Sequence, residues 1–303
     1  MVALERAGIP IEKYYASEID EYAMKISNKN YPEIIQLGDI RNVSEEVLDS
    51  IMPIDMIIGG SPCQDLSNYK YDRGEVTGLN GEKSGLFYEY IRILKYVKPK
   101  YFLLENVASM EDKWKDLMSE IIGVQPIMIN SALVCAAERK RLYWTNIPNI
   151  QQPVDKGIEL KDILEDVSFE HPAAIRGRNI DLNKATIVGR RLNQNGHRED
   201  YNKKIPITQC LEVRATNTNK SNCLTTVDKD NVLTPLPIGR YPDVFNKNLP
   251  FRYYTTKEMC RLQTLPDNYL DMIPNTAARK ALGNGWTVDV IAHILRNIPE
   301  KDR

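Results

Sequence analysis

One cysteine stands where its thiol could do chemistry. Cys63 lies in the stretch GGSPCQDLS, where an apolar run breaks into glycine, proline and polar residues. A structural thiol is expected inside the apolar run, because free cysteine packs like a small hydrophobic side chain. A nucleophilic thiolate is expected at a strand-to-loop turn, where free backbone amides or nearby arginines lower its pKa. The position therefore predicts a nucleophile at the rim of the fold.

Charged side chains elsewhere could complete a site around this thiol. Glu105 ends the apolar stretch YFLLE, and a carboxyl group kept protonated in a confined pocket can donate to a ring nitrogen. Arg139 and Arg141, in CAAERKRLYW, could provide the positive field that ionises the thiol. We interpret Cys63, Glu105, Arg139 and Arg141 as candidate catalytic residues.

Two more acids follow earlier strand-like stretches. Glu18 comes after YYAS and Asp39 after IIQLG, and such carboxylates suit the hydroxyls of a ribose and an exocyclic amine. A single acid would be weak support, since every strand must end in some residue. Polar residues at four strand ends instead indicate one site, because ligands of parallel sheets bind at the carboxyl ends of the strands.

The elements that must position these residues alternate along the first 150 residues. The patterns predict strands at 11–19, 34–40, 54–60 and 98–107, and helices at 21–31, 44–52 and 84–97. Ser44 and Ser84 are the expected N-caps. Short apolar strands joined by helices predict an α/β fold with a mostly parallel, Rossmann-like sheet that is covered on both faces.

From about residue 151 to 250 the pattern changes to proline, asparagine and charge. Strand-like fragments remain at 184–192, 211–216 and 223–227, which predicts a second, smaller and irregular β-containing domain. Helical patterns return at 255–265 and 277–298, and we expect this tail to pack on the first domain. The predicted domains are 1–150 with 251–303, and 151–250.

The composition excludes several classes of protein. The chain has 303 residues, a net charge of -1, five cysteines without a Cys-x-x-Cys pair and three scattered histidines, so neither a disulfide framework nor a metal site is expected. There is no signal-peptide pattern, and no apolar run approaches the roughly 18 residues that span a bilayer. We predict a cytoplasmic protein without a metal.

The charge is uneven along the chain. Residues 171–225 contain ten Lys or Arg against four Asp or Glu, interleaved with Asn, Gln and Gly. A solvated face is the usual explanation of such a stretch, and a surface that binds a polyanion is the other. Composition alone leaves both open.

The order of the motifs resembles that of the cytosine carbon-5 DNA methyltransferases. GGSPCQDLS is followed by ENV, AERKR, LQTLPDNY and LGNGWTVDVI, and the resemblance covers about residues 10–297. The variable middle region stands where the family has its target-recognition domain. The LGNGW ending and the alanine before Glu138 are closest to the de novo enzymes and to phage relatives.

The resemblance implies a role for each matching residue. Cys63 adds to carbon 6 of a flipped-out cytosine, Glu105 contacts ring nitrogen 3, Arg141 holds the oxygen of the base and Arg139 supports it. Carbon 5 then takes the methyl group of S-adenosylmethionine. The base must leave the stack because a side chain cannot reach the attacked atom in duplex DNA. Residues that shape this pocket are Asn106 and Ser61.

The resemblance also implies where the cofactor and the DNA bind. Glu18 binds the ribose of S-adenosylmethionine and Asp39 the adenine amine. The residues that line the cofactor pocket are Ile19, Ile40, Gly60, Leu86, Asn284 and Trp286. A role for Trp286 as an anchor of the last helix in the core is the alternative. Candidate contacts to DNA are Ser61, Gln64, Arg190, Arg191 and Arg214.

The beginning of the chain departs from the family pattern. MVALERAGI resembles the helix that follows the family's first strand and its glycine turn, so we expect a gap in the sheet. Two hypotheses follow: further residues precede this start, which we favour, or the form shown binds the cofactor poorly.

Three functions result. The leading one is a bacterial or phage DNA cytosine methyltransferase, acting on duplex DNA as a monomer or weak oligomer, beside a cognate restriction endonuclease or in protecting a phage genome. The second is a transfer-RNA methyltransferase, and the third a DNA-binding paralogue with impaired catalysis. For Cys135, Cys210, Cys223 and Cys260 we expect packing rather than chemistry.

Overall fold

The computed structural model describes residues 1–62, 66, 79, 81, 84–166, 182–214 and 218–303. They form two compact units. Unit 1 consists of Met1–Ser131, Lys140–Val154 and Val288–Arg303, and unit 2 of Ala132–Arg139 and Asp155–Thr287. These bounds differ from the predicted domains, because residues 251–287 lie in unit 2 and not with the first 150 residues. Which unit binds cofactor and which reads DNA stays a prediction.

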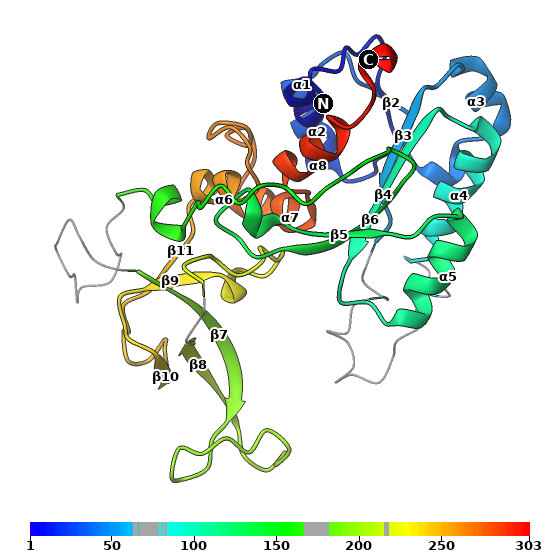
Figure 1. The fold of residues 1–303 in the computed structure, drawn as a ribbon. Helices are drawn as coiled ribbons and strands as arrows, with labels where there is room; N and C mark the ends of the chain where they lie inside the picture. Colours follow the sequence, from blue (N-terminus) through cyan, green and yellow to red (C-terminus); the bar gives the residue numbers. More distant parts are fainter. Residues whose placement is uncertain (63–65, 67–78, 80, 82–83, 167–181, 215–217) are drawn as a thin grey trace. The chain divides into compact units, whose positions relative to one another are not determined.

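Figure 1 labels most of the α-helices and strands of both units. Unit 1 contains α1 (Val2–Ala7), β1 (Tyr15–Ala16), α2 (Glu21–Asn30), β2 (Ile35–Gln36), η1 (Ile40–Asn42), α3 (Glu45–Ile51), β3 (Met56–Gly60), α4 (Leu86–Val97), β4 (Tyr101–Val107), α5 (Asp112–Ile122), β5 (Ile127–Asn130), β6 (Lys140–Thr145), α8 (Val288–Leu295) and η7 (Glu300–Asp302). The short η4 (Ser131–Leu133) passes from unit 1 into unit 2. Unit 2 contains η5 (Leu160–Ile163), β7 (Asn183–Arg191), β8 (Ile207–Val213), η6 (Asp228–Asp230), β9 (Val232–Thr234), β10 (Gly239–Pro242), β11 (Arg252–Tyr253), α6 (Thr256–Leu262) and α7 (Asn275–Asn284).

The described strands of unit 1 form two sheets. β1 pairs with β2 in parallel, and a four-stranded sheet has the order β3-β4-β6-β5. β3 and β4 are parallel, whereas β6 runs antiparallel to both β4 and β5. The α/β class is confirmed, whereas the gap expected from the beginning of the chain stays a prediction. The strands at 11–19 and 34–40 are shorter than expected.

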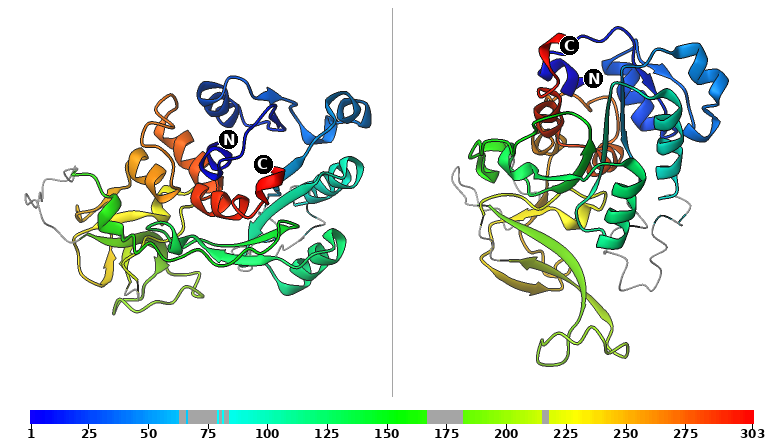
Figure 2. Two further views of the ribbon diagram at one scale, coloured as in Figure 1. Left: turned by 45° about the horizontal axis from the view of Figure 1, so that its top comes forward. Right: turned by 45° about the vertical axis from the view of Figure 1, so that its right-hand side comes forward.

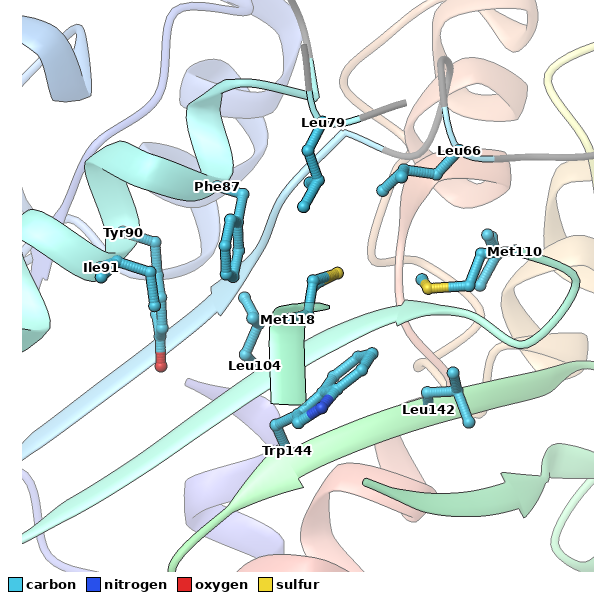
Figure 3. Close-up of a cluster of buried hydrophobic side chains, with 11 residues drawn as sticks. Leu66, Leu79, Phe87, Tyr90, Ile91, Leu104, Met110, Met118, Leu142 and Trp144 are labelled. Atoms are coloured by element: carbon cyan, nitrogen blue, oxygen red, sulfur yellow. The ribbon is translucent and has the colours of Figure 1, made fainter. Parts of the chain in front are cut away.

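Helices α4 and α5 cover one face of the four-stranded sheet. Phe87, Tyr90 and Ile91 of α4 are buried at helical spacing, and they pack in one cluster with Leu104 of β4 and Trp144 of β6. Figure 3 shows Met118 of α5 among these side chains. This packing holds β4, the strand that carries Glu105, against rigid helices.

The two expected N-caps have different outcomes. Ser44 caps α3, because its side chain accepts a hydrogen bond from the amide of Val47. The predicted cap at Ser84 is wrong, since α4 begins after Gly85. The hydroxyl of Ser84 instead donates to the carbonyl of Pro62 at 3.0 Å. The hydroxyl of Ser84 thus bonds a residue that is distant in the sequence and does not cap the helix.

The C-terminal helical pattern at 277–298 is two helices. α7 ends at Asn284, and α8 begins at Val288. Arg6 of α1 pairs with Asp289 of α8 at 2.8 Å, and Arg296 donates to the carbonyl of Arg6. The expectation that the tail packs on the first domain is therefore confirmed for α8, whereas α7 belongs to unit 2.

Unit 2 is built on an antiparallel sheet of order β10-β8-β7-β9-β11. β7 and β8 form a long hairpin (Figure 2). The strand predicted at 223–227 is wrong, because this segment turns. Thr225 makes its hydrogen bonds to side chains and not to a neighbouring strand. Its N–H donates to Asn231, and its hydroxyl donates to Asp230. The next strand is β9.

Gly59 in β3 fits closely under an aromatic ring. A Cβ atom at Gly59 would lie 2.6 Å from Cδ2 of Tyr90, whose ring is buried. We expect Gly59→Ala to lower the free energy of unfolding by about 1–3 kcal/mol, because the ring must move within a packed core. Urea denaturation measures this loss. In a Tyr90→Leu background the same substitution should cost less, and an equal cost would contradict the contact.

Candidate active site

A buried ion pair lies at the end of the four-stranded sheet. Glu105 of β4 is opposite Gly60 of β3 and Tyr143 of β6, so strands on both sides fix its backbone. Its carboxylate oxygen Oε1 lies 2.8 Å from Nε of Arg141, and only 10% of the Glu105 side chain and 14% of the Arg141 side chain are exposed. The structure therefore brings two of the predicted catalytic residues together within unit 1.

The chain that leads to Cys63 is anchored beside this pair. Nδ2 of Asn106, the residue after Glu105, donates to the hydroxyl oxygen of Ser61 at 3.0 Å and to its carbonyl at 3.3 Å. Ser84 holds the carbonyl of Pro62. Two consecutive residues before the cysteine are thus fixed to β4 and to the start of α4. Cys63 and Gln64 themselves lie outside the described residues.

Arg139 is the last residue of a segment of unit 2, whereas Arg141, two residues later, belongs to unit 1. Its side chain is buried, and its two terminal nitrogens donate to the carbonyls of Leu224, Gly283 and Gly285. A guanidinium used in this way ties the segment at Leu224 to the turn at Gly283 and Gly285. These contacts favour a positioning role, whereas the predicted role in support of the base stays a prediction.

The turn between α7 and α8 carries the predicted cofactor residues Asn284 and Trp286. Asn284 is exposed and Trp286 is half-buried. Arg139 holds the turn at the carbonyl of Gly285, and a Cβ at Gly283 would lie 2.6 Å from the carbonyl carbon of Thr225. Glycine is therefore required for this close approach of two backbones.

Sequence reasoning missed a second residue that fixes this turn. Nε2 of Gln263 donates to the carbonyls of Leu282 and Gly285, and its Oε1 accepts from the hydroxyl of Thr287 at 2.8 Å. Its amide is buried and uses both of its ends. The signal was present, since Gln263 lies in the LQTLPDNY motif.

Glu18 and Asp39 follow the parallel strands β1 and β2 at their carboxyl ends. Oε1 of Glu18 accepts from the amides of Ile19 and Asp20 at 2.8 and 2.9 Å. Hydrogen bonds from the side chain and backbone of Arg41 lower the pKa of Asp39 to about 2. Asp39 is therefore an ionised acceptor at neutral pH, suited to an amine.

The remaining predicted cofactor residues lie on the same unit. Ile19 is a large apolar side chain that is 65% exposed, and Ile40 begins η1 directly after Asp39. Gly60 is the last residue of β3, and Leu86 is the first of α4. Exposed apolar surface beside two acids suits a ligand with an apolar ring and polar ribose.

The predicted DNA contacts in unit 2 differ in their surroundings. Arg190 bonds Glu212 through Nε and Nη2, and 14% of its side chain is exposed. Arg191 donates to the carbonyls of Lys203 and Ile205 in the β7–β8 loop. Arg214 is 70% exposed. Of the three, Arg214 is the one that presents most of its side chain to solvent.

The other cysteines are structural in their surroundings. Cys135, Cys210 and Cys260 are buried, and burial raises the pKa of Cys260 to about 12. Cys223 is half-buried, with its sulfur 3.1 Å from Nη1 of Arg139. Within the described ranges, no group of His, Cys, Asp and Glu could hold a metal ion. No helix there is long and apolar enough to cross a membrane.

Comparison with protein families agrees with this arrangement. The family described as C-5 cytosine-specific DNA methylase matches residues 1–124 and 133–300. The chain belongs to the C-5 cytosine-specific DNA methylases. The match takes in both units, including Glu105, Arg139, Arg141 and the turn after α7.

Named methylases resemble the chain over different lengths. The type II methyltransferase M1.ScrFI of Lactococcus lactis subsp. cremoris is 25% identical over 97% of this chain and 74% of the relative. M.FnuDI of Fusobacterium nucleatum is 41% identical, over 37% of this chain and 30% of its own length. The orphan methyltransferase M.Rho11sI of Bacillus phage rho11s is 30% identical over 63% of this chain and 40% of its own. Type II and phage methyltransferases are thus among the relatives.

Solved structures share the fold of this methylase. Entamoeba histolytica methyltransferase EhMeth has a TM-score of 0.64 at 18% identity and covers 98% of this chain and 92% of its own. A mutant of Spodoptera frugiperda DNMT2 has a TM-score of 0.63 at 21% identity and covers 98% and 95%. At these identities the likeness shows the fold alone.

Glu105→Gln separates the charge of this residue from its shape. Glutamine keeps an oxygen that can accept from Arg141, so we expect a folded protein. Methyl transfer to DNA should fall by about 10²–10⁴-fold, the usual loss when an acid–base group is removed. Single-turnover methylation measures the rate, and circular dichroism checks the fold. A rate within a few-fold of wild type would contradict a catalytic role.

Arg139→Ala tests the positioning role. We expect the free energy of unfolding to fall by about 3 kcal/mol, because several buried carbonyls lose a charged donor together. Urea denaturation measures the change. Lys140→Ala is the matched control, since Lys140 is the next residue and is exposed. Equal stabilities of the two variants would contradict the role inferred for Arg139.

Proposed function

We propose that this chain transfers a methyl group from S-adenosylmethionine to carbon 5 of cytosine in duplex DNA, with Cys63 as the nucleophile. The observation that carries the proposal is the buried pair of Glu105 and Arg141 beside the anchored residues Ser61 and Pro62. Cys63 follows Pro62 directly in the sequence.

Each protein group has a defined task. The Cys63 thiolate forms a bond to carbon 6 of the base, and the electron pair moves onto the ring toward carbon 5 and nitrogen 3. Glu105 binds nitrogen 3, where it balances the charge that develops, and Arg141 binds the carbonyl oxygen of the base. The existing pair holds both side chains in place before the base enters.

S-adenosylmethionine supplies an electrophilic methyl group to carbon 5 of the activated ring. A base then removes the proton from carbon 5, and the electrons of that bond expel the sulfur of Cys63 from carbon 6. The enzyme is regenerated, and the product is 5-methylcytosine. The base must be turned out of the helix for this sequence to occur.

The rim of β1 and β2 fits the cofactor by its chemistry. Ionised Asp39 is an acceptor for the adenine amine, Glu18 for the ribose hydroxyls, and the exposed side chain of Ile19 is apolar surface for the adenine ring. Ile40, Gly60, Leu86, Asn284 and Trp286 are further candidates. No metal is required by this chemistry.

The partner we propose is duplex DNA, read by residues between 151 and 250. Type II and phage methyltransferases are among the relatives of this chain. Their names support a location in the cytoplasm of a bacterial or phage-infected cell, and a cognate restriction endonuclease as the associated enzyme. We propose a monomer or a weak oligomer.

Cys63→Ser tests the function directly. We expect incorporation of labelled methyl groups into duplex DNA to fall at least about a thousandfold, because serine is a far weaker nucleophile at neutral pH. DNA affinity, measured by gel shift, should stay within about twofold, since DNA is bound chiefly through its phosphates and grooves. A parallel loss of both properties would assign Cys63 a structural role. Transfer by the wild type into transfer RNA but not into duplex DNA would refute the substrate.

A further inference from the structure

One face of the sheet in unit 2 is apolar, and the opposite face carries a cluster of charged side chains. Side chains of a strand alternate between faces. Ala185 and Ile187 of β7 and Leu211 and Val213 of β8 belong to the core cluster. The alternate positions carry most of the charge of the sheet, and Arg214 directly follows β8. The residues at these positions are Lys184, Thr186, Val188, Arg190, Thr208, Cys210, Glu212, Arg240 and Pro242.

Glu212 is the centre of this charged face. Its carboxylate accepts from Arg190 at 2.7 Å, from Arg214 at 2.7 Å and from Arg240 at 3.1 Å. Only 5% of its side chain is exposed. Burial raises the pKa of Glu212, but hydrogen bonds from Arg190 and Arg214 outweigh burial and hold the pKa at about 2. The carboxylate therefore stays charged at neutral pH and fixes the arginines that surround it.

The three arginines are not equivalent. Arg190 is enclosed, with 14% of its side chain exposed, and it lies 3.8 Å from a second acid, Asp200. Arg214 is 70% exposed and Arg240 is 36% exposed, and Arg240 reaches Glu212 through Nε. Arg190 is enclosed with the carboxylate of Glu212 and neutralises it. Arg214 and Arg240 contact the same carboxylate and expose more of their side chains to solvent.

Charge complementarity identifies the partner of this face. Three arginines, Arg190, Arg214 and Arg240, share the carboxylate of Glu212, and Asp200 lies 3.8 Å from Arg190, so the cluster keeps a positive excess. Such an excess suits a polyanion. A guanidinium whose orientation is already fixed suits guanine. Two of its planar N–H groups can donate to oxygen 6 and nitrogen 7 at the same time.

We propose that this face contacts duplex DNA, that Arg214 and Arg240 read guanine in the recognition sequence, and that Glu212 is the positioning residue that orients them. The inference rests on the proposed function and deepens it, since it names the residues that select the target. Arg190 and Arg191, by contrast, serve the hairpin itself through Glu212, Lys203 and Ile205.

Arg214→Lys and Arg240→Lys test the proposal, because lysine keeps the charge and loses the two-to-two fork. Plasmid DNA of known sequence is methylated in vitro with wild type and each variant, and the methylated cytosines are mapped by bisulfite sequencing. We expect the wild type to require guanine at defined flanking positions. Each variant should relax that requirement at one position by about tenfold or more, the discrimination of one bidentate pair.

Glu212→Gln should relax the same positions as both arginine variants, because the carboxylate orients both. Lys161→Ala is the matched control: this exposed lysine also lies in unit 2 and also pairs with an acid, Glu159. It should leave the sequence preference unchanged. Arg214 is so exposed that its variant should fold normally, so a failure of the Glu212 variant to fold leaves the test intact.

The outcomes separate this inference from the function on which it rests. Methylation of plasmid DNA by wild type, with the same preference in both lysine variants, would overturn the guanine-reading role alone. A salt dependence of DNA binding that changes without any change in preference would assign the two arginines to phosphates and also overturn it. Absence of methylation by wild type would overturn the proposed function itself.

Discussion

The candidate site depends on one buried pair of opposite charges. Glu105 and Arg141 are both largely removed from water, and two such groups are tolerated only when they face one another at hydrogen-bonding distance. Their positions follow from the sheet, because β4 carries the acid and its antiparallel neighbour β6 carries the base. The core of α4 and α5 side chains stabilises these strands from one face. A charged pair in a packed sheet is held in place before any ligand binds.

Arginines of unit 2 also bind buried acceptors, but they do so in different surroundings. Arg139 is buried and binds backbone carbonyls, so it fixes the turn after α7. Arg190 is enclosed and binds a carboxylate, so it organises a sheet face. Arg214 shares that carboxylate yet lies largely in solvent. Exposure, more than residue type, distinguishes the arginines that hold the fold from those available to a partner.

Local patterns in the sequence were sufficient for much of unit 1. Helices α2 and α3 and strands β3 and β4 lie where periodicity and caps predicted them, because these signals act within a few residues. The side chain of Ser84 was misassigned since its partner, Pro62, lies 22 residues away. Long-range contacts also decided the burial of Arg139, and no local pattern reports them.

The division of the chain was the least predictable feature. Residues 251–287 resume a helical pattern, which favoured the first domain, yet they pack in unit 2. Their binding partners explain this outcome: Gln263 and Gly283 both fix the turn after α7, and Arg252 pairs with Glu258 within the buried part of unit 2. The motifs named Glu105 and Arg141 as partners, and the pairing of β4 with β6 brings these two residues together. The roles of the other motif residues stay predictions.

The central claim is that Cys63 attacks a cytosine held by Glu105 and Arg141. The most direct measurement uses duplex DNA that contains 5-fluorocytosine, from which the carbon-5 substituent cannot leave as a proton does. The protein and S-adenosylmethionine are incubated with this DNA, denatured and analysed by mass spectrometry with peptide mapping. The account predicts a covalent adduct at Cys63 whose mass includes the added methyl group. An adduct at another residue, or methylation of ordinary DNA without any adduct on the fluorinated substrate, would contradict it.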